Sequence, residues 1–225
     1  MLLYVCLVLG AWKGVMGKHV VCNEPNSQVC NTVRDLSFPK TEADIDQMCP
    51  LLIEHLDCLQ DYSDKCGSNG DLQLFPGMRD VVEDGCRKDS SLHLRIVQSI
   101  GCFHEVVRYD IEACNNYTKG KSAAARKYIL NLEAKPGHDE DNYDHELWMP
   151  FRCLMQSLEV VCLESKSSER CGSDAGGVLL EVVGRAGFSR RFCASSSEDS
   201  LAELLTLLEL ESEEEASLNR LIRGE

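Results

Sequence analysis

The sequence predicts an all-α fold, a disulfide-rich helical array built from two related six-cysteine units. Apolar residues recur every three or four positions over most of the chain, which is the period of an amphipathic helix, whereas strand patterns are almost absent. A cysteine-spaced stretch occurs twice, as residues 49–66 and 153–171, with eight residues between its first two cysteines and Cys-Gly-Ser at its end. The chain also carries thirteen cysteines in 225 residues.

The N-terminal residues indicate a secretory signal peptide. Residues 2–12 are almost wholly apolar but too short to span a bilayer. The small-residue triplet Val15-Met16-Gly17 follows and fits signal-peptidase cleavage, so we place the cleavage after Gly17. No later segment is apolar enough to span a membrane, so we expect a secreted, extracellular protein.

The cysteines predict six disulfides. Cys6 leaves with the signal peptide, so twelve of the thirteen cysteines remain, and an even number in a secretory chain is typical of a disulfide framework. The usual zinc spacings CxxC and CxxxC are missing, so we expect no metal. The residues expected to be paired are Cys22, Cys30, Cys49, Cys58, Cys66, Cys86, Cys102, Cys114, Cys153, Cys162, Cys171 and Cys193.

The signal peptide, the grouping of the cysteines and a Ser-rich linker divide the chain into four parts. These are the signal peptide (1–17), a first six-cysteine helical unit (18–100), a second unit (101–193), and a Ser-rich linker with an amphipathic C-terminal helix (194–225). We expect the leucines of that last helix to pack on the protein's own core rather than on a partner.

Local signals place individual helices. Thr41-Glu42-Ala43-Asp44 is typical of a helix start, and Cys66-Gly67 and Cys171-Gly172 are typical of helix ends. Pro50 predicts a kink or a fresh start inside the first repeated helix. After a cap at Asp89-Ser90-Ser91, one apolar stripe predicts a helix that continues to Cys114. A further helix is expected over residues 119–134, and a loop over the glycine-rich residues 172–177.

Helix geometry restricts the pairing. Cys49 and Cys58 are nine residues apart, so on one helix they point to opposite sides and lie roughly 13 Å apart along the axis. A disulfide needs Cα atoms within about 7 Å. Each repeated helix must therefore bond outward to other segments. Cys102 and Cys114, on one helix, also cannot bond each other. A Cys22–Cys30 bond and bonds between the two units stay open.

A family resemblance rests on cysteine spacing and on two phrases. The runs Cys30-NTVRDLSFPKTEADIDQM-Cys49 and HLDCLQDYSDKC, with GCFHEV later, resemble secreted, cysteine-rich helical proteins of arthropods, and the chain is loosely similar to the haemolymph glycoprotein family. The similarity covers most of residues 22–193. It implies an extracellular all-α disulfide fold of unassigned function and supplies no catalytic residues. Family members often open the second half with adjacent cysteines, where this chain has Phe151-Arg152-Cys153.

Four stretches carry residue types found in catalytic, metal-binding or processing sites. Residues 104–108, His-Glu-Val-Val-Arg, begin like the zinc-protease signature but lack its second histidine, so His104 is interpreted as a helix-surface residue. The acidic loop 138–146 lacks the register of a calcium-binding EF-hand and is interpreted as solvated. Residues 172–177 follow a helix end and are not a phosphate loop. Arg190-Arg191 immediately precedes Phe192-Cys193, where a bridged backbone is protected, so we expect no processing there.

These observations predict a non-enzymatic secreted protein with a structural or interaction role, and no cofactor. The net charge of −14 argues against nucleic acid as a partner. Asn116-Tyr117-Thr118 is an N-glycosylation sequon, with Asn116 as the acceptor. The alternative is a carrier of small hydrophobic ligands with an odorant-binding-protein-like role, because bridged helices often enclose apolar sites. The partner would then be a small apolar ligand, and otherwise an extracellular protein.

Overall fold

A computed structural model describes residues 22, 26–30, 33, 36–66, 77–133, 148–194 and 196–224. All regular structure within these residues is helical, so the predicted all-α, disulfide-rich fold is confirmed. The helices are α2 (Asn26–Val29), α3 (Glu42–Cys66), α5 (Met78–Cys86), α6 (Ser91–Tyr109), α7 (Ile111–Lys121), α8 (Ala123–Glu133), α10 (Met149–Cys171), α11 (Ser173–Arg185), α12 (Phe188–Phe192), α13 (Glu198–Thr206) and α14 (Ser212–Arg223).

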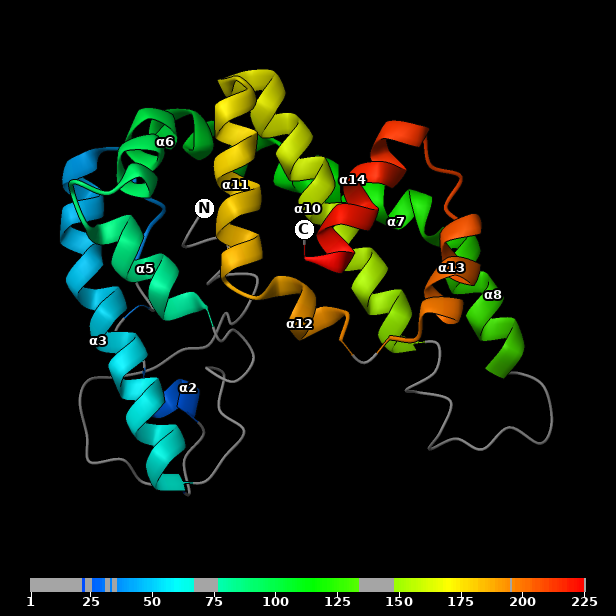
Figure 1. Ribbon diagram of the computed structural model, residues 1–225, viewed down its shortest axis with the longest axis horizontal. Coiled ribbons are helices and arrows are strands. Elements are labelled where there is room, and N and C mark those ends of the chain that lie inside the picture. The colour runs from blue at the N-terminus through cyan, green and yellow to red at the C-terminus, as the bar shows by residue number, and fades with distance from the viewer. Residues whose placement is uncertain are drawn as a thin grey trace.

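The helices form an elongated array (Figure 1). α2, α3 and α5 lie at one end, α7, α8, α13 and α14 lie at the other, and α10 and α11 lie between them. α10 is the central element, since it packs against α6, α7, α11, α12, α13 and α14. One continuous hydrophobic core runs through both ends, and a small second cluster joins α2 to the distal part of α3.

The predicted start of α3 is confirmed. The Thr41 hydroxyl accepts a hydrogen bond from the Asp44 N–H at 3.2 Å, and the Asp44 carboxylate accepts from the Lys40 and Thr41 N–H groups at 2.9 Å each. These bonds, led by the Lys40 N–H, lower the pKa of Asp44 below its ordinary value. The predicted fresh start at Pro50 is wrong, because α3 is one helix from Glu42 to Cys66. Pro50 is exposed, where water can satisfy the carbonyl that its missing N–H leaves unpaired.

The disulfides agree with the helix geometry, which requires the cysteines of each repeated helix to bond to other segments. All twelve predicted cysteines are paired, with Cα atoms 4.9 to 5.7 Å apart, and each bond joins one cysteine of α3 or α10 to a cysteine outside that helix. The pairs are Cys22–Cys66, Cys30–Cys58, Cys49–Cys86, Cys102–Cys171, Cys114–Cys162 and Cys153–Cys193. The Cys22–Cys30 bond and the bonds between units that the sequence left open are therefore not formed.

The order of pairing is the same in both halves of the chain. The first cysteine of the repeated helix bonds to the cysteine that follows the helix, the second to the nearer upstream cysteine, and the third to the farther one. The relationship between the two units nevertheless stays a prediction. The predicted boundary between residues 100 and 101 falls inside α6, which packs against α5 as well as α10.

Three predicted helix boundaries differ from the structure. The stripe that ends at Cys114 belongs to two helices, α6 and α7, which meet at Asp110. The buried Asp110 carboxylate pairs there with Arg170 of α10, at 2.5 Å from Oδ2 to Nε and 3.1 Å from Oδ1 to Nη2. The helix expected over 119–134 begins as α8 only at Ala123. The loop expected over 172–177 is wrong beyond Gly172, because α11 begins at Ser173.

The C-terminal segment is also two helices rather than one. α13 ends at Thr206 and α14 begins at Ser212, and Glu209 between them has a φ of 50°. Leu204, Leu208 and Leu218 are fully or almost fully buried in the main core. The prediction that the leucine stripe packs on the protein's own core is therefore confirmed.

Gly77 allows α5 to approach the end of α11, and we predict that Gly77→Ala destabilises the protein. A Cβ at Gly77 would lie 1.7 Å from the backbone oxygen of Arg185, so backbone must move. Overpacking of this kind lowers the free energy of unfolding by about 1–3 kcal/mol or more. Urea unfolding followed by circular dichroism measures the loss.

Gly101→Ala is the matched control for this prediction. Gly101 is exposed on α6 and a Cβ there would meet nothing within 4 Å, so alanine should raise the free energy of unfolding by about 0.5–1 kcal/mol. If both variants were equally stable, the close approach of α5 to α11 would be disproved.

Candidate functional site

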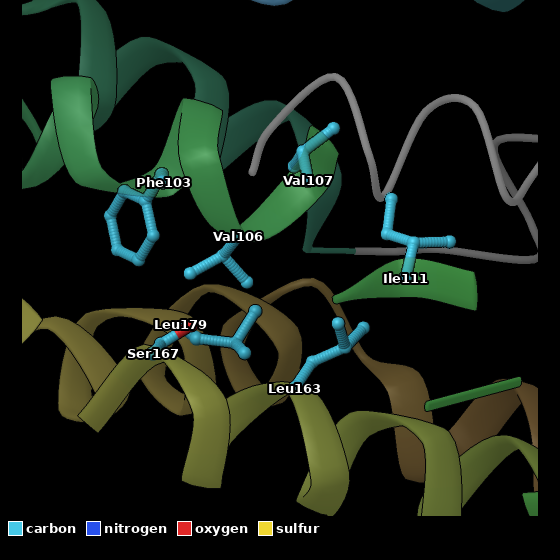
Figure 2. Close-up of a pocket in the computed structure, with 7 residues that line it drawn as sticks. All are labelled: Phe103, Val106, Val107, Ile111, Leu163, Ser167 and Leu179. Atoms are coloured by element: carbon cyan, nitrogen blue, oxygen red, sulfur yellow. The ribbon is translucent and has the colours of Figure 1, made fainter. Parts of the chain in front are cut away.

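An apolar pocket lies where α6, α7, α10 and α11 meet (Figure 2). Figure 2 shows Phe103 and Val106 of α6 facing Leu163, Ser167 and Leu179 of α10 and α11 across one space, and the other lining residues are Val107 of α6 and Ile111 of α7. The helical period explains the convergence, since Phe103, Val106 and Val107 are three and four residues apart and share one face of α6. Leu163 and Ser167 share a face of α10 in the same way.

The pocket is small and its open lining is apolar. Its volume is about 20 Å³, which is room for about one water molecule. A stably held water needs two to four polar partners, whereas Ser167 is the single hydroxyl-bearing residue of the lining. The site can accept a methyl-sized apolar group, but a drug-sized ligand needs a pocket of about 300–1,000 Å³. The lining contains one hydroxyl, that of Ser167, and no His, Cys, Asp, Glu, Lys or Arg.

A buried histidine that the sequence analysis did not single out joins three elements of the first half. His93 of α6 is 1% exposed, and its Nδ1 lies 2.8 Å from the Gly85 carbonyl of α5. Because a carbonyl only accepts, Nδ1 carries the proton. Nε2 faces the Glu42 carboxylate of α3 at 3.7 Å and has no hydrogen-bond partner. His93 shares the inward stripe with Ile96 and Ile100, a helical spacing that could have revealed its burial.

The other sequence candidates stay apart. The His104 side chain, expected on the surface, is only 21% exposed, lies beside the Phe38 ring and faces the Glu105 carboxylate at 3.5 Å. Among the residues that the structure describes, no group of three or more His, Cys, Asp or Glu is placed to hold a metal ion. The acidic loop 138–146 lies outside the described residues. Arg190 and Arg191 lie on α12, next to the Cys153–Cys193 bridge.

The sequon lies on α7, with its two functional side chains on different sides of the helix. Asn116 is exposed, whereas Thr118 is 2% exposed and its hydroxyl oxygen is buried with no hydrogen-bond partner. Between them, the Tyr117 hydroxyl donates to the Glu214 carboxylate of α14. α7 thus carries a solvent face, a core face and a face that holds the C-terminal segment.

The bond from Tyr117 predicts a loss of stability at alkaline pH. Burial, and then the bond to Glu214, raise the pKa of Tyr117 well above its ordinary value. A raised folded-state pKa contributes stability that is complete below the unfolded value of about 10 and declines as the pH rises through the folded value. The urea midpoint of the protein should therefore fall between about pH 9 and about pH 11.

Tyr117→Phe tests the origin of this alkaline loss. The variant should be less stable than the wild-type chain at neutral pH, and its urea midpoint should fall less steeply in the alkaline range. Tyr109→Phe, at an exposed tyrosine of α6, is the control and should keep the wild-type slope. A Tyr117→Phe variant with the wild-type slope would contradict the assignment.

In the part of the chain that the structure describes, no helix is long and apolar enough to cross a membrane. No family model matches this chain, and comparisons with curated proteins and with solved structures gave no match either.

Proposed function

We propose that the chain is a secreted, non-enzymatic protein that acts in extracellular fluid through the surface of its disulfide-stapled helices. The observation that carries the proposal is the pairing of twelve cysteines in six bridges. Such bridges form and persist in oxidising compartments, whereas the cytosol keeps thiols reduced. The resemblance to the haemolymph glycoprotein family agrees with this location and remains a prediction.

A non-catalytic role is supported by how the core uses its buried polar groups. Asp110 holds Arg170 across the junction of α6 and α7, and His93 bonds the carbonyl of Gly85. The Ser122 hydroxyl donates to the Thr118 carbonyl at the C-terminal end of α7. The first two groups each fix one helix relative to its neighbour and Ser122 closes the end of a helix, which are structural uses rather than catalytic ones.

Secretion from eukaryotic cells tests the location. With its own N-terminal residues, the protein should reach the medium with Lys18 as its first residue and with no free thiol. Its mass should be lower than that of the fully reduced chain by two hydrogens for each of the six bridges. Retention inside the cells, or free thiols in the folded protein, would overturn the proposal.

The alternative, a carrier of small hydrophobic ligands, is favoured by the pocket between α6, α7, α10 and α11. Because that pocket holds only about 20 Å³, a carrier would have to open these helices to admit its cargo. Mass spectrometry of an organic extract of the secreted protein decides between the two. A stoichiometric apolar compound that is lost in Val107→Trp, which fills the pocket from its half-buried side, would replace the first proposal.

A further inference from the structure

A glycan-transferring enzyme cannot bind both functional side chains of the sequon while α7 is folded. Successive residues of an α-helix are rotated by about 100°, so two residues that are two positions apart point roughly 200° apart. The Asn-x-Ser/Thr requirement means that the transferring enzyme contacts the asparagine amide and the hydroxyl together. In α7 the Asn116 side chain faces solvent and the Thr118 hydroxyl is enclosed in the core.

A disulfide holds the folded α7 against α10. Cys114 precedes Asn116 by two residues, is fully buried, and bonds to Cys162 on α10. α7 also packs against α6 and α10. Local unfolding that would present Asn116 and Thr118 on one side therefore has to lift the residues after Cys114 off α10 while the bridge keeps Cys114 in place.

The solvent face of α7 has room for a glycan once it is attached. Ala113, Asn116 and Gly120 are all exposed and follow one another at the helical spacing of three and four. A Cβ at Gly120 would meet nothing within 4 Å. The C-terminal segment docks on a different part of α7, where Tyr117 bonds Glu214 of α14 and Lys121 bonds the carbonyl of Glu209, which precedes α14. A sugar on Asn116 would thus leave the folded contacts intact.

We propose that Asn116 accepts a glycan only while α7 is unfolded, before the Cys114–Cys162 bridge closes, so that glycosylation and folding compete at this site. This deepens the proposed function and rests on it for the cellular setting, since both reactions need the secretory pathway.

The donor is an oligosaccharide linked to a lipid diphosphate. The Asn116 Nδ2 forms a bond to the sugar C1, the bond from C1 to the diphosphate oxygen breaks, and the diphosphate leaves with the electron pair while the amide gives up one proton.

The test is glycan transfer in vitro to protein without a glycan. Oligosaccharyltransferase and a lipid-linked donor are supplied to the folded, fully bridged protein and, separately, to the reduced and alkylated chain, and the peptide that contains Asn116 is followed by mass spectrometry. The initial rate with the bridged protein should be at least about tenfold lower. Equal rates would overturn the proposal, and so would no transfer to either form.

Two α10 variants separate the effect of the bridge from a general loss of stability. Cys162→Ser frees α7, whereas Cys171→Ser removes the bridge from α10 to α6, and both cysteines are half-buried. In the oxidised state, transfer to Cys162→Ser should exceed transfer to Cys171→Ser. Equal rates would show that α7 is not held by its own bridge. The comparison of bridged with reduced wild-type protein does not depend on whether these variants fold.

Thr118→Val supplies the baseline. The valine has nearly the shape of threonine and replaces a hydroxyl that has no partner, so the urea midpoint should be unchanged or higher. Transfer to this variant should be absent even in the reduced chain. Because the assay supplies both enzyme and donor, it remains decisive if the protein is not secreted; failed secretion overturns the proposed function alone.

Discussion

Replacing Cys153 and Cys193 together by alanine is expected to lower the free energy of unfolding by about 5–7 kcal/mol. The bond closes a sequence separation of 40 residues, and a loop of this length contributes about 4 kcal/mol in the chain-entropy description. The rest comes from packing, because both sulfurs lie in the main core and Cys153 is fully buried. Urea unfolding followed by circular dichroism measures the loss.

The double alanine variant of Cys22 and Cys66 is the matched control. Its sequence separation is 44 residues, so the loop contribution is nearly the same, about 4 kcal/mol. Cys22 is exposed and Cys66 is half-buried, so little packing is lost with them. The control should therefore lose about 1–3 kcal/mol less than the core variant. Equal losses in the two variants would show that the position of a bridge in the core adds nothing.

Leu218→Ala is expected to lower the free energy of unfolding by about 2–5 kcal/mol. Leu218 of α14 is fully buried and belongs to the same core as the leucines of α10. No disulfide reaches α13 or α14, so burial of leucines and a few polar bonds such as Lys121 to the Glu209 carbonyl hold these helices in place. The loss should come with faster hydrogen exchange in α14.

Leu130→Ala is the control for the C-terminal helix. Leu130 of α8 is 46% exposed, so its truncation should change the free energy of unfolding by no more than about 0.5 kcal/mol. If Leu218→Ala behaved like this control, and α14 already exchanged freely in the wild-type protein, the docking of the C-terminal segment would be disproved.

Features governed by helical period or by covalent geometry could be predicted from the sequence. The cap at Thr41 and Asp44 is a local pattern that needs no tertiary contact, and the structure contains it. The outward pairing of Cys49 and Cys58 follows from the rise and rotation of a helix alone. The partner of each of these two cysteines depends on the fold and could not be predicted from the sequence.

The sequence predictions are wrong where a tertiary contact determines where a helix begins or ends. On one straight helix Cys102 and Cys114 would lie roughly 18 Å apart, whereas their partners on α10 are nine residues and roughly 13 Å apart. The break at Asp110 accommodates this difference, and the pairing of Asp110 with Arg170 stabilises it. No local pattern in the sequence of α6 and α7 indicates that the helix must break at Asp110.

Tertiary packing also explains why a glycine and three acidic residues lie in other settings than the sequence predicts. Gly176 was assigned to a loop, yet it lies inside α11, where a Cβ would come within 2.0 Å of the Ser168 Oγ on α10. It is glycine because two helices approach closely, not because the chain turns. The acidic residues 213–215 would lie inside the single C-terminal helix that the sequence predicts, but they occupy the first turn of α14, where negative charge is favourable.

The burial of His93 could have been predicted from the sequence, whereas its hydrogen bond and the pocket could not. His93 occupies the same stripe as Ile96 and Ile100, so its burial was within reach, but its bond to Gly85 depends on how α5 meets α6. The pocket needs four helices whose relative positions only the fold determines.

The arrangement of the six bridges determines what a protease can remove. Bridges span every peptide bond from Cys22 to Cys86 and from Cys102 to Cys193. A single cut in either span, including one at Arg190-Arg191, leaves the pieces covalently joined. Only a cut within 87–101 separates the two halves, and much of that stretch is the buried start of α6. The pieces from one cut inside a span would thus separate only after reduction, whereas residues 194–225 lie outside both spans and a cut just after Cys193 would leave them held by non-covalent contacts alone.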